Sequence, residues 1–273
     1  MYTSHWQLER PPFQGTCDAE FYYPSEAHQG SLLKLRYAVE NRRGAALLCG
    51  ASGTGKTMLV QLLRENLPDE FSPFIHLVIP IMSGPELLAY VADSLGVWGG
   101  PSGRASMEEV VRRIENSLAE NVRGGKHAVV VVDEAHLLVD TEAMETLRLL
   151  TNFQTASGPE LTLVLVGQPP LLPALARMPQ FEERLDVKSL LRPLSSDETA
   201  SYIAHRLSAA SAQREIFDND ALAALFELSQ GNPRRLNRLC DLALLIGYAD
   251  EQQTLSRSHI ESVAEELEVV TAD

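Results

Sequence analysis

Five short apolar runs alternate with amphipathic stretches over the first two thirds of the chain. Each run has the length of a strand, whereas the stretches between the runs carry apolar residues at helical spacing. The predicted strands are residues 45–49, 74–79, 128–132, 161–166 and 187–191, and the predicted helices are residues 25–41, 58–63, 85–95, 107–120, 141–155 and 171–177. Strands and helices that alternate in this way build a parallel sheet with helices on both faces, so the predicted fold class is α/β.

The pattern changes at Pro193, because only helices are predicted beyond it, over residues 195–210, 219–229, 233–248 and 256–267. We therefore expect an α/β domain over residues 25–192 and a small helical domain over residues 193–273 that packs against the sheet. Residues 1–24 are rich in aromatic residues and prolines, which predicts an irregular strap over a core. Two placements stay open for these aromatic side chains: against an adenine base, or over the edge of the sheet.

A glycine-rich loop follows the first predicted strand and carries the pattern G-x-x-x-x-G-K-T, from Gly50 to Thr57. Glycines let the backbone curl its N–H groups around an anion, and the N-terminus of the following helix adds its dipole. The pattern predicts a phosphate site in which Lys56 faces the β- and γ-phosphates of ATP and the Thr57 hydroxyl ligates Mg²⁺. The expected nucleotide-binding residues are Gly50, Ala51, Ser52, Gly53, Thr54, Gly55, Lys56, Thr57 and Met58.

Two acidic residues, Asp133 and Glu134, end the predicted strand of consecutive valines. Since the carboxyl ends of parallel strands lie at one edge of a sheet, both acids are expected beside the phosphate loop. We expect Asp133 to hold Mg²⁺ directly or through water, and Glu134 to polarise the attacking water. Gln168 ends the next strand, where its amide could contact the γ-phosphate or the water; a simple loop role is the alternative. His136 completes a helicase-like Asp-Glu-Ala-His, but no second motor domain fits in the chain, which favours a supporting or packing role.

Composition and charge narrow the classes of partner and compartment. The chain has 273 residues and a formal net charge of −14, which argues against a broad basic face for nucleic acid. Its three cysteines, Cys17, Cys49 and Cys240, are far apart and suit a reducing compartment. No secretion signal or apolar run of membrane-spanning length is visible, so the expected location is the cytoplasm, without membrane insertion.

The motifs and their order resemble those of the AAA+ ATPases, which are P-loop NTPases, and within them the general secretion pathway protein A type. The resemblance rests on Trp6–Phe13, Gly50–Thr57, Val132–Leu137, Val166–Pro169, Leu191–Leu194 and Gly231–Arg234. It implies ATP hydrolysis by an oligomer with the nucleotide at the protomer interface. It also implies that Arg234, from the helical lid, senses the γ-phosphate and that Arg184 reaches the neighbour's nucleotide as an arginine finger. A surface pair of Arg184 with Glu182 or Glu183 is the alternative.

Proteins of this type continue into a membrane segment and a peptidoglycan-binding region, so the expectation here is a single ATPase module. Three functions follow. The first is an ATP-hydrolysing oligomeric switch that remodels or recruits protein partners, with a link to secretion or pilus assembly. The second is a DNA-associated regulator like the transposon-encoded target-selection ATPases, which the acidic charge disfavours. The third is a nucleotide-gated scaffold without turnover, which the presence of Glu134 and Gln168 disfavours.

Overall fold

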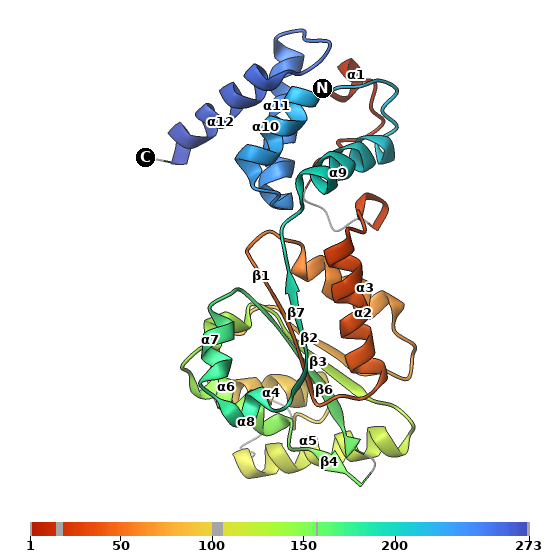
Figure 1. The fold of residues 1–273 in the computed structure, drawn as a ribbon. Helices are drawn as coiled ribbons and strands as arrows, with labels where there is room; N and C mark the ends of the chain where they lie inside the picture. Colours follow the sequence, from red (N-terminus) through yellow and green to blue (C-terminus); the bar gives the residue numbers. More distant parts are fainter. Residues whose placement is uncertain (1, 15–18, 100–105, 157, 272–273) are drawn as a thin grey trace. The chain divides into compact units, whose positions relative to one another are not determined.

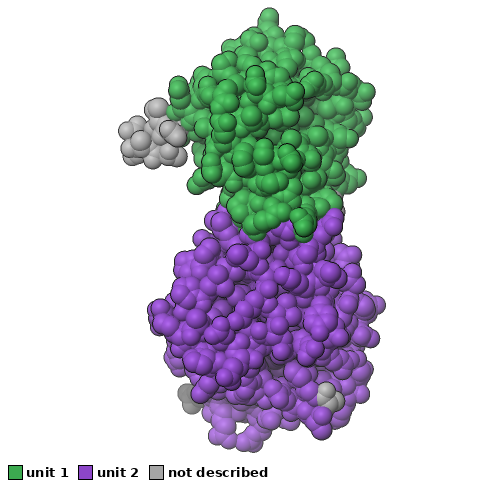
Figure 2. All heavy atoms as spheres, in the orientation of Figure 1, with its two compact units in different colours: residues 1–26, 53–55, 192–273 green, residues 27–52, 56–191 purple. Residues whose placement is uncertain are grey.

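The computed structural model describes residues 2–14, 19–99, 106–156 and 158–271, and these residues divide into two compact units. Unit 1 comprises residues 1–26, 53–55 and 192–273, and unit 2 comprises residues 27–52 and 56–191 (Figure 2). Unit 2 contains the sheet, and unit 1 contains the C-terminal helices together with the N-terminal segment. Each unit is described by itself.

Unit 2 is built on a parallel sheet of five strands in the order β2-β3-β6-β1-β7 (Figure 1). The strands are β1 (Ala45–Gly50), β2 (Phe74–Leu77), β3 (Ala128–Val132), β6 (Leu161–Gly167) and β7 (Leu185–Leu191). The helices are α2 (Glu26–Glu40), α3 (Lys56–Asn66), α4 (Gly84–Ser94), α5 (Met107–Arg123), α6 (Glu142–Leu150), α7 (Leu171–Ala176) and α8 (Pro179–Glu182), with a 3₁₀ turn η2 (Ala135–Leu138). The predicted α/β fold with a parallel sheet is confirmed.

Burial explains why these runs form strands. Every residue of β1, β3 and β6 is buried, as expected for inner strands that are covered on both faces. Strand β7 lies at an edge of the sheet and alternates buried and exposed residues instead. Leu47 and Val130 share one core with side chains of α4, α5 and α6, while α2 and α3 lie on the opposite face (Figure 1). The glycine loop follows β1 and the two acids follow β3, so both start at the ends of strands that are buried in the sheet.

Two predicted elements of unit 2 are shorter than the sequence indicated. The strand expected over residues 74–79 ends at Leu77, whose carbonyl accepts the Asp133 N–H, the last bond of that pair of strands. The helix expected over residues 141–155 ends at Leu150, and residues 154–155 pair instead with residues 158–159 as the hairpin β4–β5 (Gln154–Thr155 and Gly158–Pro159). Gly158 has φ 121°, a conformation that a helix does not continue. The loop expected over residues 96–103 lies partly outside the described residues.

Unit 1 packs four long helices with the N-terminal segment. They are α9 (Ser196–Ala209), α10 (Asn219–Ser229), α11 (Pro233–Ala249) and α12 (Arg257–Thr271), with α1 (Tyr2–His5) and the 3₁₀ turn η1 (Ala19–Phe21) from the N-terminus. The predicted helix starts are supported by caps: Ser195 and Glu198 form a reciprocal capping box before α9, and the Asn232 side chain accepts backbone N–H groups of α11.

The N-terminal aromatic residues lie in the core of unit 1. Trp6, Phe13 and Phe21 are buried among the helices there, and the Trp6 indole N–H donates to the Leu244 carbonyl at 2.8 Å. The Arg206 guanidinium is buried as well and donates to the carbonyls of residues 12 and 14. Both placements considered from the sequence, against adenine and over the sheet edge, are therefore wrong for these three side chains. Within the described residues, no helix is long and apolar enough to cross a membrane.

Candidate functional site

The glycine loop joins β1 to α3 at the carboxyl edge of the sheet. Gly53 and Gly55 have φ angles of 80° and 96°, which L-residues rarely adopt, so these two positions require glycine. Lys56 begins α3 and is 5% exposed, and its ammonium donates to the carbonyls of Gly50 at 3.0 Å and Ala51 at 2.9 Å. A buried ammonium and the start of a helix thus face the same turn of backbone, which is the electrostatic environment that an anionic phosphate needs.

Thr57 and Asp133 meet although 76 residues separate them in the sequence. The Thr57 hydroxyl donates to Asp133 Oδ2 at 2.9 Å, and the Glu134 backbone N–H donates to Asp133 Oδ1 at 2.8 Å. Burial raises the pKa of Asp133, but the His76 ring, Thr57 and this N–H outweigh it and hold that pKa below its usual value. Asp133 is therefore an anion at neutral pH, and it accepts a hydrogen bond from a hydroxyl in the first turn of α3.

Glu134 and Gln168 also come together, from the ends of the neighbouring strands β3 and β6. Gln168 Nε2 donates to Glu134 Oε2 at 3.3 Å and lies 3.0 Å from His136 Nε2. Glu134 has φ 49°, a left-handed conformation that is costly for a residue with a Cβ. The Glu134 carboxylate is 40% exposed and lies 3.4 Å from His136 Nδ1.

Thr57 and Asp133 fit the way proteins hold Mg²⁺. The ion needs six oxygen ligands and usually takes most of them from water and substrate phosphates, with only one or two from the protein. Among the described residues, no group of three or more His, Cys, Asp or Glu side chains could form a complete metal cage. The hydroxyl and carboxylate oxygens at 2.9 Å are instead the partial set that a nucleotide-borne Mg²⁺ requires.

The two arginines with expected roles lie at different places. Arg184 precedes β7 at the amino edge of the sheet, where its guanidinium donates to the Thr151 carbonyl at 2.7 Å and hydroxyl at 2.9 Å. The alternative, a surface pair of Arg184 with Glu182 or Glu183, does not form among the described residues, and Glu182 pairs with Lys188 at 2.8 Å instead. Arg234 lies in the first turn of α11 in unit 1, together with residues 53–55 of the glycine loop, and its backbone N–H donates to the Gly53 carbonyl at 3.3 Å.

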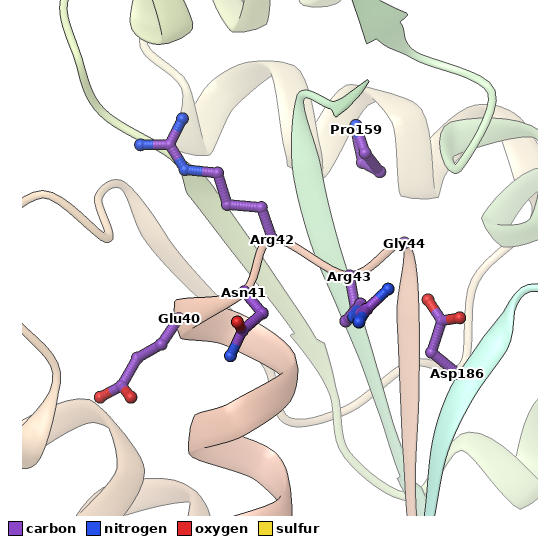
Figure 3. Close-up of a pocket in the computed structure, with 7 residues that line it drawn as sticks. All are labelled: Glu40, Asn41, Arg42, Arg43, Gly44, Pro159 and Asp186. Carbon is purple, nitrogen blue, oxygen red and sulfur yellow. The ribbon is translucent and has the colours of Figure 1, made fainter. Parts of the chain in front are cut away.

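A pocket of about 360 Å³ opens at the same amino edge as Arg184 (Figure 3). It is lined by Glu40, Asn41, Arg42, Arg43, Gly44, Pro159 and Asp186, which lie at or before the starts of β1, β6 and β7. The glycine loop follows the other end of β1, so this pocket is separate from the phosphate site. Its two arginines and two acids balance in charge, and this gives no preference for an anion.

His76 is a neighbour of the site that the sequence reading did not single out. Its Nε2 lies 3.8 Å from Asp133 Oδ2, because β2 and β3 pair in parallel with His76 beside Val131. The available signal was one polar residue within the apolar run 74–79. A histidine there is more often a surface residue of an edge strand, so the contact with Asp133 depends on the register of the two strands.

Comparisons with known proteins agree with this geometry. A family model described as "AAA domain" matches residues 39–175. The chain is 34% identical over 271 residues to "General secretion pathway protein A" of Aeromonas hydrophila; this covers 98% of the chain, which spans about half, 48%, of that relative.

Solved structures share the fold. An ORC2 protein of Aeropyrum pernix, solved as ADPNP-ADP complexes, has a TM-score of 0.65 at 16% identity, and the match covers 94% of this chain and 71% of that one. Cdc6p of Pyrobaculum aerophilum has a TM-score of 0.67 at 17% identity, with 93% and 70% covered. The structure of Drosophila ORC bound to DNA has a TM-score of 0.67 at 19% identity, with 96% and 66% covered.

Proposed function

The chain belongs to the AAA domain family, and from this premise we propose that it binds ATP with Mg²⁺ and hydrolyses it to ADP and phosphate. The observation that carries the proposal is the hydrogen bond of 2.9 Å between Thr57 and Asp133. It joins the glycine loop to the acidic strand end, so the phosphate-binding part and the metal-binding part form one site. A chance match to the loop pattern gives no reason for that second half to be present.

Each residue has a role that follows from its position. The loop N–H groups and the Lys56 ammonium bind the phosphate oxygens, with Lys56 leaving the carbonyls of Gly50 and Ala51. Thr57 and Asp133 would hold Mg²⁺, which neutralises charge that develops on the phosphates. Glu134 orients the attacking water and accepts its proton, while the Gln168 amide turns from Glu134 toward the γ-phosphate.

We propose that ATP turnover drives an oligomeric switch that acts on protein partners. Arg184 is the proposed residue that reaches a neighbour's nucleotide, because it lies at the edge of the sheet opposite to its own glycine loop. Arg234 is the proposed γ-phosphate sensor of the helical lid, residues 193–273. The name of the relative supports a partner in a secretion system. A DNA-associated regulator stays the alternative, supported by DNA-bound neighbours of the same fold and opposed by the net charge of −14.

Two variants separate binding from turnover. Lys56→Ala removes the charge that faces the phosphates and should raise the dissociation constant for ATP roughly 100-fold, the size of a hydrogen bond to a charged group. Glu134→Gln should keep ATP affinity and lose turnover, because an amide does not accept the proton. Lys34→Ala, an exposed lysine of α2, is the matched control and should change neither quantity. Isothermal titration and phosphate release measure the two effects. Unchanged affinity in Lys56→Ala would contradict the phosphate site.

A further inference from the structure

The His136 ring lies beside Glu134 and Gln168, the residues proposed to activate the water and to contact the γ-phosphate. Its Nε2 is 3.0 Å from Gln168 Nε2, and its Nδ1 is 3.4 Å from Glu134 Oε2. The ring is only 14% exposed, and Nδ1 is buried with no hydrogen-bond partner in the described part of the chain. A buried ring nitrogen without a bond is costly, which points to a use beyond packing.

The hydrogen bonds decide which ring nitrogen carries the proton. The Gln168 side chain must present its NH₂ group to Glu134, because its carbonyl oxygen would face the carboxylate oxygen with like partial charge. The same NH₂ nitrogen has no lone pair to offer, so toward His136 it can only donate, and His136 Nε2 must accept. In the neutral ring the proton is then on Nδ1, the nitrogen that faces Glu134 Oε2.

The backbone holds His136 at this place. The 3₁₀ turn η2 packs directly on the end of β6, where a Cβ added to Gly167 would lie 3.2 Å from the His136 backbone nitrogen and 2.8 Å from Leu171 Cδ2. Glu134, by contrast, is 40% exposed, and fixing an exposed glutamate side chain costs rotamer entropy. A largely buried histidine beside a partly exposed carboxylate is placed to restrain it.

We propose that His136 is a positioning residue for Glu134: its Nδ1–H restrains the carboxylate when the Gln168 amide turns to the phosphate. Without nucleotide, Gln168 holds Glu134 Oε2 at 3.3 Å and His136 stands 3.4 Å away. Once Gln168 leaves, the carboxylate moves onto Nδ1–H and stays directed at the water. The last step rests on the proposed ATPase function, whereas the Nδ1–H tautomer is a property of the protein without nucleotide.

The first test therefore uses the nucleotide-free protein. Nitrogen chemical shifts of ¹⁵N-labelled histidine rings identify which ring nitrogen is protonated, and loss of one signal set in His136→Asn assigns His136. We expect the neutral form of the ring to carry its proton on Nδ1, and in Gln168→Ala a loss of that preference. A proton fixed on Nε2 would overturn the proposal, whether or not the protein hydrolyses ATP.

The second test separates positioning from packing by kinetics. His136→Ala should lower kcat about 10-fold with KM and ATP affinity within twofold, because only the water-activating group is misplaced. His136→Asn places an amide N–H where Nδ1 stood and should regain most of kcat, whereas His136→Gln places it at Nε2 and should not. Leu137→Ala, an exposed neighbour, is the control and should match the wild type.

The outcomes of the second test are distinct. Equal kcat in the Asn and Gln variants would overturn the proposal, and this comparison of two near-isosteric variants holds even if His136→Ala fails to fold. If the wild-type protein neither binds nor hydrolyses ATP, the proposed function is refuted instead. The ring tautomer then still tests the hydrogen bonds among His136, Gln168 and Glu134 in the protein without nucleotide.

Discussion

Replacement of Trp6 by alanine should strongly destabilise unit 1. The Trp6 side chain is fully buried, donates its indole N–H to the Leu244 carbonyl at 2.8 Å, and has the Arg214 guanidinium 5.2 Å from the centre of its ring. The substitution leaves a cavity next to α11 and a buried carbonyl without that donor. Buried tryptophan-to-alanine changes cost about 3–5 kcal/mol, and we expect about 4 here.

The loss is large against the stability of a domain of this kind, about 5–15 kcal/mol in total. With a urea dependence of about 2 kcal/mol per molar, the unfolding midpoint of the helical signal should fall by about 2 M. Trp6→Phe keeps most of the ring but loses the N–H, so it should lose only about 1–2 kcal/mol. Trp98, 37% exposed, offers a matched control, and Trp98→Ala should stay within about 1 kcal/mol of the wild type.

The measurement is urea unfolding followed by far-ultraviolet circular dichroism. In Trp6→Ala the fluorescence of Trp98 reports on unit 2 alone, so the two signals tell which unit loses stability. A midpoint for Trp6→Ala that falls no further than that of Trp98→Ala would refute the reasoning, since the N-terminal segment would then contribute little to the helical core.

The remaining predictions concern His127 and Arg184. Burial, and then the charge of Arg42, lower the pKa of His127 from 6.5 to about 4. As the pH falls, the unfolded chain therefore takes up this proton before the folded protein does. The free energy of unfolding should then fall by about 3 kcal/mol between pH 6.5 and pH 4. His127→Gln should remove this part of the loss, which urea unfolding at both pH values measures. Arg184→Ala and Glu134→Gln should each lose ATPase activity, about 10³-fold or more for the arginine, and regain part of it when co-assembled. If the two variants co-assemble and stay inactive, Arg184 does not act on a neighbouring subunit.

The sequence alone determined the five strands of the sheet, most of the helices and the glycine loop between β1 and α3. Apolar runs of strand length, such as Ala128–Val132, can satisfy their backbone and bury both faces only inside a parallel sheet. The glycine pattern predicts a local backbone shape, because glycine alone adopts a positive φ without strain. Gly53 and Gly55 have such angles. Asp133 could be placed beside Thr57 from a general rule, since parallel strands bring their carboxyl ends to one edge.

The tertiary structure decided the contacts that depend on register and packing. The aromatic strap signalled burial, but only the assembled helices show that Trp6 belongs to the core of unit 1. The bond of Arg184 to Thr151 depends on where α6 ends, and the sequence pattern placed that end five residues too late. The approach of His136 to Glu134 and Gln168 depends on η2 packing against Gly167, where a glycine leaves room that hydrophobic periodicity does not encode. Local preferences specify elements, whereas such contacts depend on residues far apart in the chain and exist only once each unit has folded.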